Sequence, residues 1–226
     1  MNEFARKWSF SLIFGLCVYI ASKAIEGIVV PLIAVNLDFP SLSVASRVIF
    51  SYGMNSAFLI LMFLEHRRLI FSDIYFAGNI KCKFIFIGAF IITVVYVAEH
   101  ILSIFLSLPR EPTIDALFKG KSTADLITLV CVLLLLPPIA EELAFRHFLI
   151  SIFPYKSNKY IAIFAALSTS IYFSLSHSYI NTESYVVVFI VGMVLCFYRI
   201  KTNGILTSIV LHSYAIGVSA LMAIFL

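Results

Sequence analysis

Long apolar stretches, separated by short polar connections, run along almost the whole chain. Their lengths are typical of helices that cross a bilayer. They lie at about 8–36, 43–64, 83–108, 124–153, 160–180, 184–200 and 204–226. The first and fourth are longer than one straight crossing needs, which predicts a tilt or a break in those helices. The pattern therefore predicts an all-α, polytopic membrane helix bundle of about seven transmembrane spans.

Composition supports a membrane protein and excludes an ordinary soluble domain. Hydrophobic residues make up 62% of the chain and charged residues 12%, whereas soluble domains average about 25% charged residues. We therefore expect a single integral membrane domain over residues 1–226, with the lipid bilayer as its main surroundings. The formal net charge of +4 is small, and it gives no reason to expect a nucleic-acid partner.

Basic residues gather at alternate ends of successive windows, which predicts the orientation of the bundle. They are Arg6, Lys7, Arg67, Arg68, Lys81, Lys83, Lys156, Lys159, Arg199 and Lys201. In the opposite connections, acids offset the bases Arg110, Lys119 and Lys121. By the positive-inside rule the N-terminus is cytoplasmic and the C-terminus, after seven spans, is outside. We expect a multi-pass protein of the cell membrane, and a bacterial plasma membrane is compatible with the chain.

Three ionisable residues stand close together in the fourth apolar window. Glu141, Glu142 and Arg146 lie within six residues of each other, and an intramembrane charge costs about 2.5–3.5 kcal/mol on insertion scales, so such groups usually mark a function. Glu142 and Arg146 are four residues apart, so they share a helix face and are expected to form an ion pair. Glu141 points elsewhere, is left unpaired and suits the work of a general base. The pair Pro137-Pro138 just before them is expected to kink the helix or to begin its second half.

Two histidines interrupt later apolar windows. His177 ends the stretch Tyr172–His177, and His212 lies in the last window. A carboxylate and two imidazoles from three separate spans are sufficient for hydrolysis. The carboxylate and one histidine deprotonate a water, and the other histidine stabilises the oxyanion or completes a metal site.

These three stretches resemble the motifs of a known family. Glu141-Glu142-x-x-x-Arg146, Phe173-x-x-x-His177 and His212 look like the three motifs of the CPBP (Abi) membrane proteins, the CAAX-prenyl-protease and bacteriocin-processing family. The run from Gly192 to Leu206 also resembles that family's link between its second and third motifs. The resemblance covers about 137–215. Residues 1–123 would then be family-variable spans, and 124–226 would be the spans that carry the motifs.

The resemblance implies an intramembrane endopeptidase that acts on a peptide or a membrane protein. Glu141 and His177 would activate the water, and His212 would help to bind the oxyanion. Glu142 and Arg146 would form a structural or substrate-orienting pair. Because nothing in the sequence distinguishes a prenylated C-terminus from a bacteriocin leader or another lipophilic peptide, the substrate stays open.

The chain departs from the family pattern at two positions. The third motif usually continues to Asn, or a similar polar residue, four positions after the histidine, where this chain has Ile216. Position 147, commonly glycine in the first motif, is His147. Ile216 lacks the oxyanion donor expected there, and loss of one such donor lowers rates by about 10²–10³. Ser208 and Ser213 are nearby candidates for that role.

Metal dependence stays open at this stage. Glu141, His177 and His212 could supply three ligands to Zn²⁺ and leave a fourth position for water. Family members have been described both as metalloproteases and as glutamate-dependent peptidases. The chain contains no H-E-x-x-H helix that would favour zinc.

Two rival functions use the same residues. The first is a catalytically weak or inactive family member that acts as a bacteriocin-immunity or scaffold protein, and Ile216 favours it. The second is a small transporter in which buried Glu and His relay protons, although no inverted repeat supports it. The polar pair Glu99-His100 in the third window fits no motif. It is expected either to line a cavity or contact a substrate, or to make an interhelical hydrogen bond.

Overall fold

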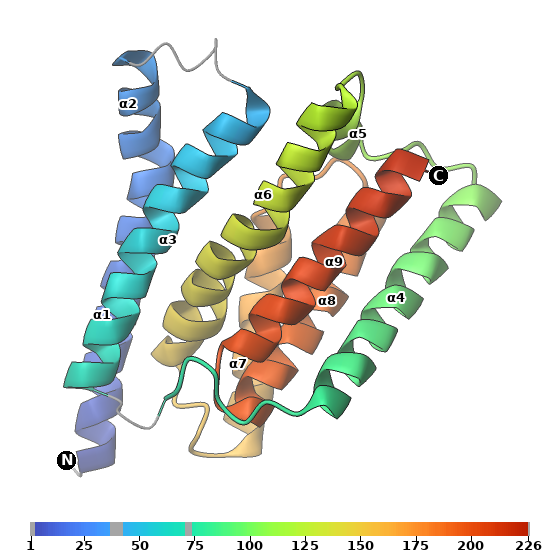
Figure 1. The fold of residues 1–226 in the computed structure, drawn as a ribbon. Helices are drawn as coiled ribbons and strands as arrows, with labels where there is room; N and C mark the ends of the chain where they lie inside the picture. Colours follow the sequence, from blue (N-terminus) through green and yellow to red (C-terminus); the bar gives the residue numbers. More distant parts are fainter. Residues whose placement is uncertain (1–2, 37–42, 71–73, 226) are drawn as a thin grey trace.

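The computed structural model describes residues 3–36, 43–70 and 74–225. All regular elements within these ranges are helices, which run up and down in one bundle (Figure 1). In chain order they are α1 (Glu3–Ala24), the π-helical η1 (Ile25–Val29), α2 (Val30–Asn36), α3 (Val44–Leu69), α4 (Cys82–Phe105), α5 (Pro112–Phe118), α6 (Thr123–Glu141), the π-helical η3 (Glu142–Leu149), the 3-10 turn η4 (Ile150–Ile152), α7 (Lys159–Leu175), α8 (Thr182–Thr202) and α9 (Leu206–Phe225). The predicted all-α membrane bundle is confirmed.

The number of helices that qualify as membrane spans differs from the prediction. Within the described residues, six stretches are long and apolar enough to cross a bilayer: Lys7–Val35, Val44–Leu69, Cys82–Phe105, Thr123–Ile152, Thr182–Thr202 and Leu206–Phe225. The window predicted at 160–180 forms α7, which has only 17 residues. At about 1.5 Å per residue such a helix covers about 26 Å, less than the roughly 30 Å of a bilayer core. The count of about seven spans is therefore not confirmed.

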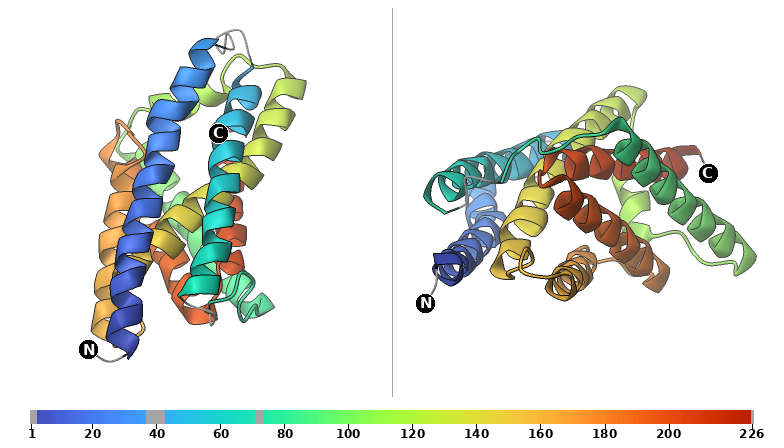
Figure 2. Two further views of the ribbon diagram at one scale, coloured as in Figure 1. Left: turned by 90° about the vertical axis from the view of Figure 1, so that its left-hand side faces the viewer. Right: turned by 90° about the horizontal axis from the view of Figure 1, so that it is seen from below.

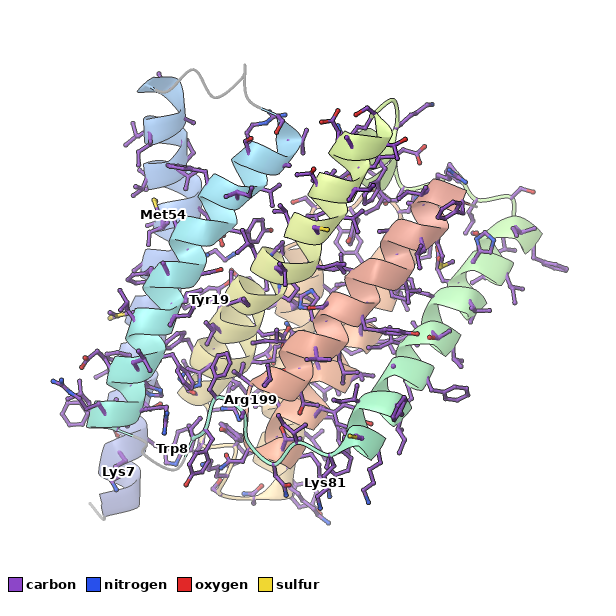
Figure 3. All side chains as sticks on the ribbon, viewed as in Figure 1. Lys7, Trp8, Tyr19, Met54, Lys81 and Arg199 are labelled. Atoms are coloured by element: carbon purple, nitrogen blue, oxygen red, sulfur yellow. The ribbon has the colours of Figure 1, made fainter. Side chains whose placement is uncertain are left out.

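Many of the basic residues lie at one end of the bundle, in or beside its connections. The N-terminal end of α1 lies at the lower end in Figure 1, and the C-terminal end of α9 lies at the upper end. Lys7 and Lys81, far apart in the sequence, both lie toward the lower end in Figure 3. We call this the basic end. That the basic end faces the cytoplasm stays a prediction from the positive-inside rule.

Both of the unusually long apolar windows contain a π-helical segment. In the first window η1 separates α1 from α2. In the fourth, Pro137 and Pro138 lie inside α6, which continues to Glu141 and then widens into η3. Because proline has no N–H, two helical hydrogen bonds are missing here. The wider π turn also rotates the side chains that follow it, as is frequent at functional sites.

The segment η3 lies in the middle of the bundle, and every one of its eight side chains is buried. Viewed from below (Figure 2, right), α1 and α3 lie side by side at one edge and α4 lies at the other. The core around η3 contains Leu143, Phe145 and Phe148, which pack with Phe63 of α3. A π-helical turn in the core therefore presents both Glu142 and Arg146 to the bundle interior.

Candidate active site

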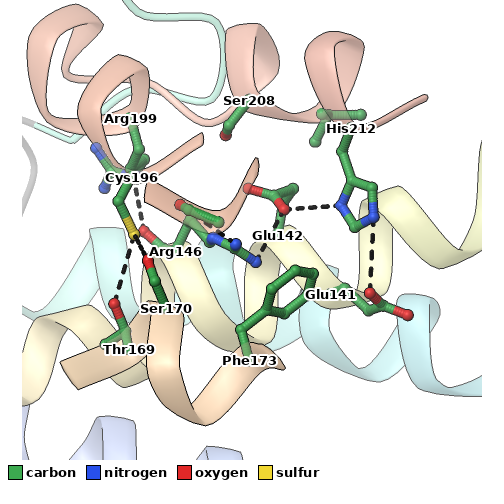
Figure 4. A network of polar contacts seen from close by, with 12 residues as sticks. Glu141, Glu142, Arg146, Thr169, Ser170, Phe173, Cys196, Arg199, Ser208 and His212 are labelled. Carbon is green, nitrogen blue, oxygen red and sulfur yellow. Dashed lines mark hydrogen bonds and ion pairs between the residues drawn. The ribbon is translucent and has the colours of Figure 1, made fainter. Parts of the chain in front are cut away.

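Three elements that are far apart in the sequence bring Glu141, His177 and His212 together. Glu141 is the last residue of α6, His177 lies in the turn after α7, and His212 lies in the second turn of α9. The Oε2 atom of Glu141 is 3.8 Å from Nε2 of His177 and 3.7 Å from Nε2 of His212. Figure 4 shows the contact between Glu141 and His212. The three residues predicted to carry the chemistry thus face one small space.

Helix α7 ends at Leu175, and the turn that follows its C-terminal end positions His177. At this end, Ser176 Oγ and His177 Nδ1 both lie 2.7 Å from the carbonyl oxygen of Phe173, and Ser178 adopts a φ of +52°. A carbonyl oxygen only accepts hydrogen bonds, so Nδ1 of His177 is the donor. In the neutral imidazole, Nε2 then carries a free lone pair that faces Glu141.

Glu142, in contrast, is fully buried and lies between the side chains of Arg146 and His212. Its Oε1 atom is 3.1 Å from Nη1 of Arg146, so the predicted ion pair is present. The same oxygen is 2.8 Å from Nδ1 of His212, a contact that the sequence did not suggest (Figure 4). The side chains of Arg146, Glu142 and His212 therefore form a continuous chain, which holds the His212 ring with its Nε2 atom toward Glu141.

The Arg146 guanidinium is enclosed by two neighbouring helices. It lies 3.8 Å from the ring centre of Phe173 in α7, and its Nη2 atom is 3.5 Å from the carbonyl oxygen of Gly192 in α8. A Cβ atom at Gly192 would lie 3.2 Å from that nitrogen. Gly192 thus leaves room for a buried cation on an aromatic face, an arrangement that stabilises the cation most when water is excluded.

Glu141 is not unpaired as predicted, because Tyr52 of α3 contacts it. The Tyr52 hydroxyl donates to Oε1 of Glu141 over 3.1 Å, while Oε2 has no hydrogen-bond partner among the described residues. Tyr52 is one of several aromatic residues in an apolar span, so nothing in the sequence marks it as a site residue. The hydrogen bond from Tyr52 uses Oε1 of Glu141 and leaves Oε2 free to face the two histidines.

Tyr52→Phe is expected to lower kcat about 10-fold to 100-fold and to leave KM unchanged, because a carboxylate without its supporting hydrogen bond loses its orientation. Steady-state kinetics on one cleaved peptide measure both constants. Tyr160→Phe is the control, since that side chain is exposed. A Tyr52→Phe enzyme with an unchanged kcat would exclude this positioning role.

The candidate oxyanion donors Ser208 and Ser213 do not reach the space between Glu141 and the histidines as donors. Their hydroxyls donate to backbone carbonyls of Ile205 and Ile209, at 2.8 and 3.0 Å. Among the residues singled out from the sequence, His212 is therefore the one whose ring nitrogen faces this space as a potential donor.

His147, the second departure from the family pattern, lies away from the site and in the core. Its Nε2 atom is 2.9 Å from Nδ1 of His66 in α3, and Nε2 of His66 is 3.1 Å from the hydroxyl of Ser11 in α1. All three residues are buried. This chain of polar contacts ties η3 to α1 and α3, so His147 contributes to the placement of η3.

The site meets some requirements of a zinc centre. Each histidine has Nδ1 against a carbonyl or a carboxylate and Nε2 toward Glu141, which is how metal-binding histidines are usually oriented. Ligands of a tetrahedral zinc ion lie roughly 3.3 Å apart, whereas the contacts to Glu141 are 3.7 and 3.8 Å. Within the part of the chain that the structure describes, no group of three such side chains has metal-binding geometry as it stands. For Glu141, His177 and His212 to bind zinc, both histidine rings would have to move closer to the Glu141 carboxylate.

The turn that carries His177 is stabilised by hydrogen bonds to an acidic residue of the α4–α5 connection. The Glu111 carboxylate accepts the backbone N–H groups of Ile180, at 3.1 Å, and Asn181, at 3.0 Å. It also accepts the hydroxyl of Ser184 over 3.3 Å. Desolvation raises the pKa of this carboxyl group, but the backbone donors of Asn181 and Ile180 outweigh that effect and the net pKa is lowered. The ionised form therefore stabilises the turn.

Glu111→Gln is expected to loosen the turn 176–182 at neutral pH, seen as faster amide hydrogen exchange there than in the wild type. Because the pKa is lowered on folding, the stabilisation is present above the ordinary value and is lost as the pH falls through the folded value. The difference between wild type and variant should therefore shrink in acid. Equal exchange rates in this turn at neutral pH would contradict the assignment.

Comparisons with known proteins found a family model and a relative that match this chain. A family model described as type II CAAX prenyl endopeptidase Rce1-like matches residues 123–216, which include Glu141, His177 and His212. An Escherichia coli protein described as an uncharacterized 24.3 kDa protein is 32% identical over 171 residues, which cover 74% of this chain and 76% of that protein. No solved structure matches. The chain therefore belongs to the Rce1-like, CAAX-type family of membrane proteases, the CPBP family that its motifs resemble.

Proposed function

We propose that this chain is an intramembrane endopeptidase that hydrolyses a peptide bond of a membrane-associated or lipophilic peptide by means of a water activated by Glu141 and His177. The observation that carries the proposal is that Oε2 of Glu141 and Nε2 of His177, both free to accept a proton, lie 3.8 Å apart. One water between them would donate a hydrogen bond to each and direct its oxygen lone pair outward, toward a scissile carbonyl carbon.

During this reaction Glu141 takes up one proton and then releases it. As the bond from the water oxygen to the carbonyl carbon forms, one proton passes from the water to Glu141. The same proton then passes to the peptide nitrogen as the carbon–nitrogen bond breaks, which returns Glu141 to its ionised form. Tyr52, on the other carboxylate oxygen, keeps Oε2 aimed at the water throughout.

His212 is proposed to bind the oxyanion. In its protonated form, the ring donates Nδ1–H to Glu142 and would donate Nε2–H to the oxygen of the scissile carbonyl. Glu142 is in turn neutralised by Arg146, so the donor is held in place before the reaction begins. Donors fixed in advance in a water-poor site are a large source of rate acceleration, which is consistent with the absence of a polar side chain at Ile216.

Zinc is the alternative activator at this site. When bound by Glu141, His177 and His212, zinc would supply Lewis-acid activation of the water. Glu142 and the Phe173 carbonyl would then orient the two histidine ligands.

We also propose that the protein lies in a bacterial plasma membrane with its basic end in the cytoplasm. The alternation of basic residues between connections supports this orientation, and the relative from Escherichia coli supports the bacterial setting.

The experiment that tests the function is cleavage of a peptide library by the purified protein in detergent, with products identified by mass spectrometry. We expect cleavage that a metal chelator leaves unchanged. Loss of activity with a chelator and its return with zinc would replace the metal-free mechanism with zinc activation. Cleavage that persists in full in Glu141→Ala would overturn both mechanisms.

A further inference from the structure

A cavity lies beside the proposed active site, at the end of the bundle opposite the basic end. It has a volume of about 160 Å³ and is lined by α4, α5, their connection, α8, α9 and the turn after α7. Its walls include Tyr96, Glu99, His100, Glu111, Asp115 and Tyr179. The polar pair Glu99-His100, which fitted none of the family motifs, thus lines this cavity.

One aromatic ring separates this cavity from the catalytic histidine. The Tyr179 ring, which lines the cavity, stacks on His177 with ring centres 5.5 Å apart and planes inclined by 23°. The Tyr179 carbonyl oxygen accepts the Tyr185 hydroxyl over 2.7 Å, which fixes this turn on α8. Because an extended peptide advances about 3.3 Å per residue, a chain cut beside His177 passes Tyr179 within about two residues. Its next side chains then reach the cavity.

The cavity carries an excess of negative charge, and one of its acids makes no hydrogen bond or ion pair with the residues that the structure describes. Three carboxylates face one guanidinium, that of Arg110. Glu111 is used by the turn that it holds, and Asp115 lies 3.8 Å from Arg110. The Glu99 carboxylate has neither a hydrogen bond nor an ion pair with any residue that the structure describes. An unpaired acid on an apolar membrane helix is costly and points to a binding partner.

The size and walls of the cavity define that partner. A volume of about 160 Å³ suits one side chain, since sites for whole small molecules take about 300–1,000 Å³. Two tyrosines, Tyr96 and Tyr179, are among the walls, together with the carboxylate of Glu99, and aromatic rings and carboxylates both attract cations. On the basis of the proposed function, we propose that this cavity is a subsite for a lysine or arginine side chain of the peptide substrate, close to the bond that is cut.

The test uses dye-labelled apolar peptides that carry a single lysine at successive positions, and a matched set with glutamine in its place. Binding to the Glu141→Gln protein in detergent, which separates binding from cleavage, is measured by fluorescence anisotropy. At one position we expect lysine to bind about 5-fold more tightly than glutamine, the upper end of the effect of one partly exposed charge pair. Glu99→Gln should remove that preference. Asp125→Asn, an acid of α6 that is not among the described cavity residues, should keep it.

Two outcomes separate this subsite from the proposed function. Equal binding of the lysine and glutamine peptides at every position, or a preference that survives Glu99→Gln, would overturn the subsite even if the wild type cuts peptides. A lysine preference that depends on Glu99, in a protein whose wild type cuts none of the bound peptides, would support the subsite and contradict the peptidase.

Discussion

Glu141→Gln is expected to lower kcat by about 10³ or more on any peptide that the wild type cuts, with little change in KM. Glutamine keeps the size of the side chain and an oxygen that can accept from Tyr52, but it cannot take a proton from water. General-base catalysis contributes about 10²–10⁴, and a group that acts only in the transition state affects kcat and leaves KM unchanged. Steady-state kinetics with product analysis by mass spectrometry measure the effect.

Glu65→Gln is the matched control for this variant. Glu65 is a partly exposed glutamate that pairs with Arg68 near the basic end of α3, far from the site in the sequence and in the fold. It should keep the wild-type rate. A Glu141→Gln enzyme that retains more than about a tenth of the wild-type kcat would exclude Glu141 as the base, because even the weakest general bases contribute more than that.

Arg146→Met is expected to give the largest loss of stability of any single substitution discussed, about 3–5 kcal/mol. Both members of the Arg146–Glu142 pair are fully buried, so removal of the guanidinium leaves the Glu142 carboxylate without its compensating cation. The stacking of Arg146 on the Phe173 ring is lost as well. Thermal unfolding in detergent measures the change as a lower midpoint or as a failure to purify a folded protein.

Two further variants distinguish a lost charge pair from lost packing. Arg110→Met breaks the half-exposed pair with Asp115 and should cost less than about 1 kcal/mol. Glu142→Gln combined with Arg146→Met removes both charges and should be markedly more stable than Arg146→Met alone. If the double variant is no more stable than the single one, the buried pair is not the source of the loss.

Much of the fold was predictable because the bilayer imposes a simple rule on the sequence. Backbone groups must be satisfied within each segment, so apolar windows of sufficient length become helices. The same rule makes ionisable residues in such windows conspicuous, and the structure brings Glu141, His177 and His212 to one space. The ion pair of Glu142 with Arg146 followed from helical spacing alone, and the π turn did not disturb it.

What the sequence could not predict depends on contacts between distant segments. Tyr52 reaches Glu141 across 89 positions in the chain, and nothing sets it apart from other tyrosines in apolar helices. The contact of Glu142 with His212 needs the π turn of η3 to face α9. The hydropathy pattern also overestimated the length of α7. Hydropathy does not register the hydrogen bonds of Ser176 and His177 to the Phe173 carbonyl, which end the helix.

The most direct test of the account is a double-mutant cycle on cleavage of one verified peptide, with Glu141→Gln, His177→Ala and the double variant compared in proteoliposomes. If both side chains act on one water, each single variant should lose about 10³ in kcat, and the double variant should be hardly slower than either, since residues that act as a unit are not additive. Full activity in both single variants would contradict the account. Losses that multiply in the double variant would show that the two residues do not share one water.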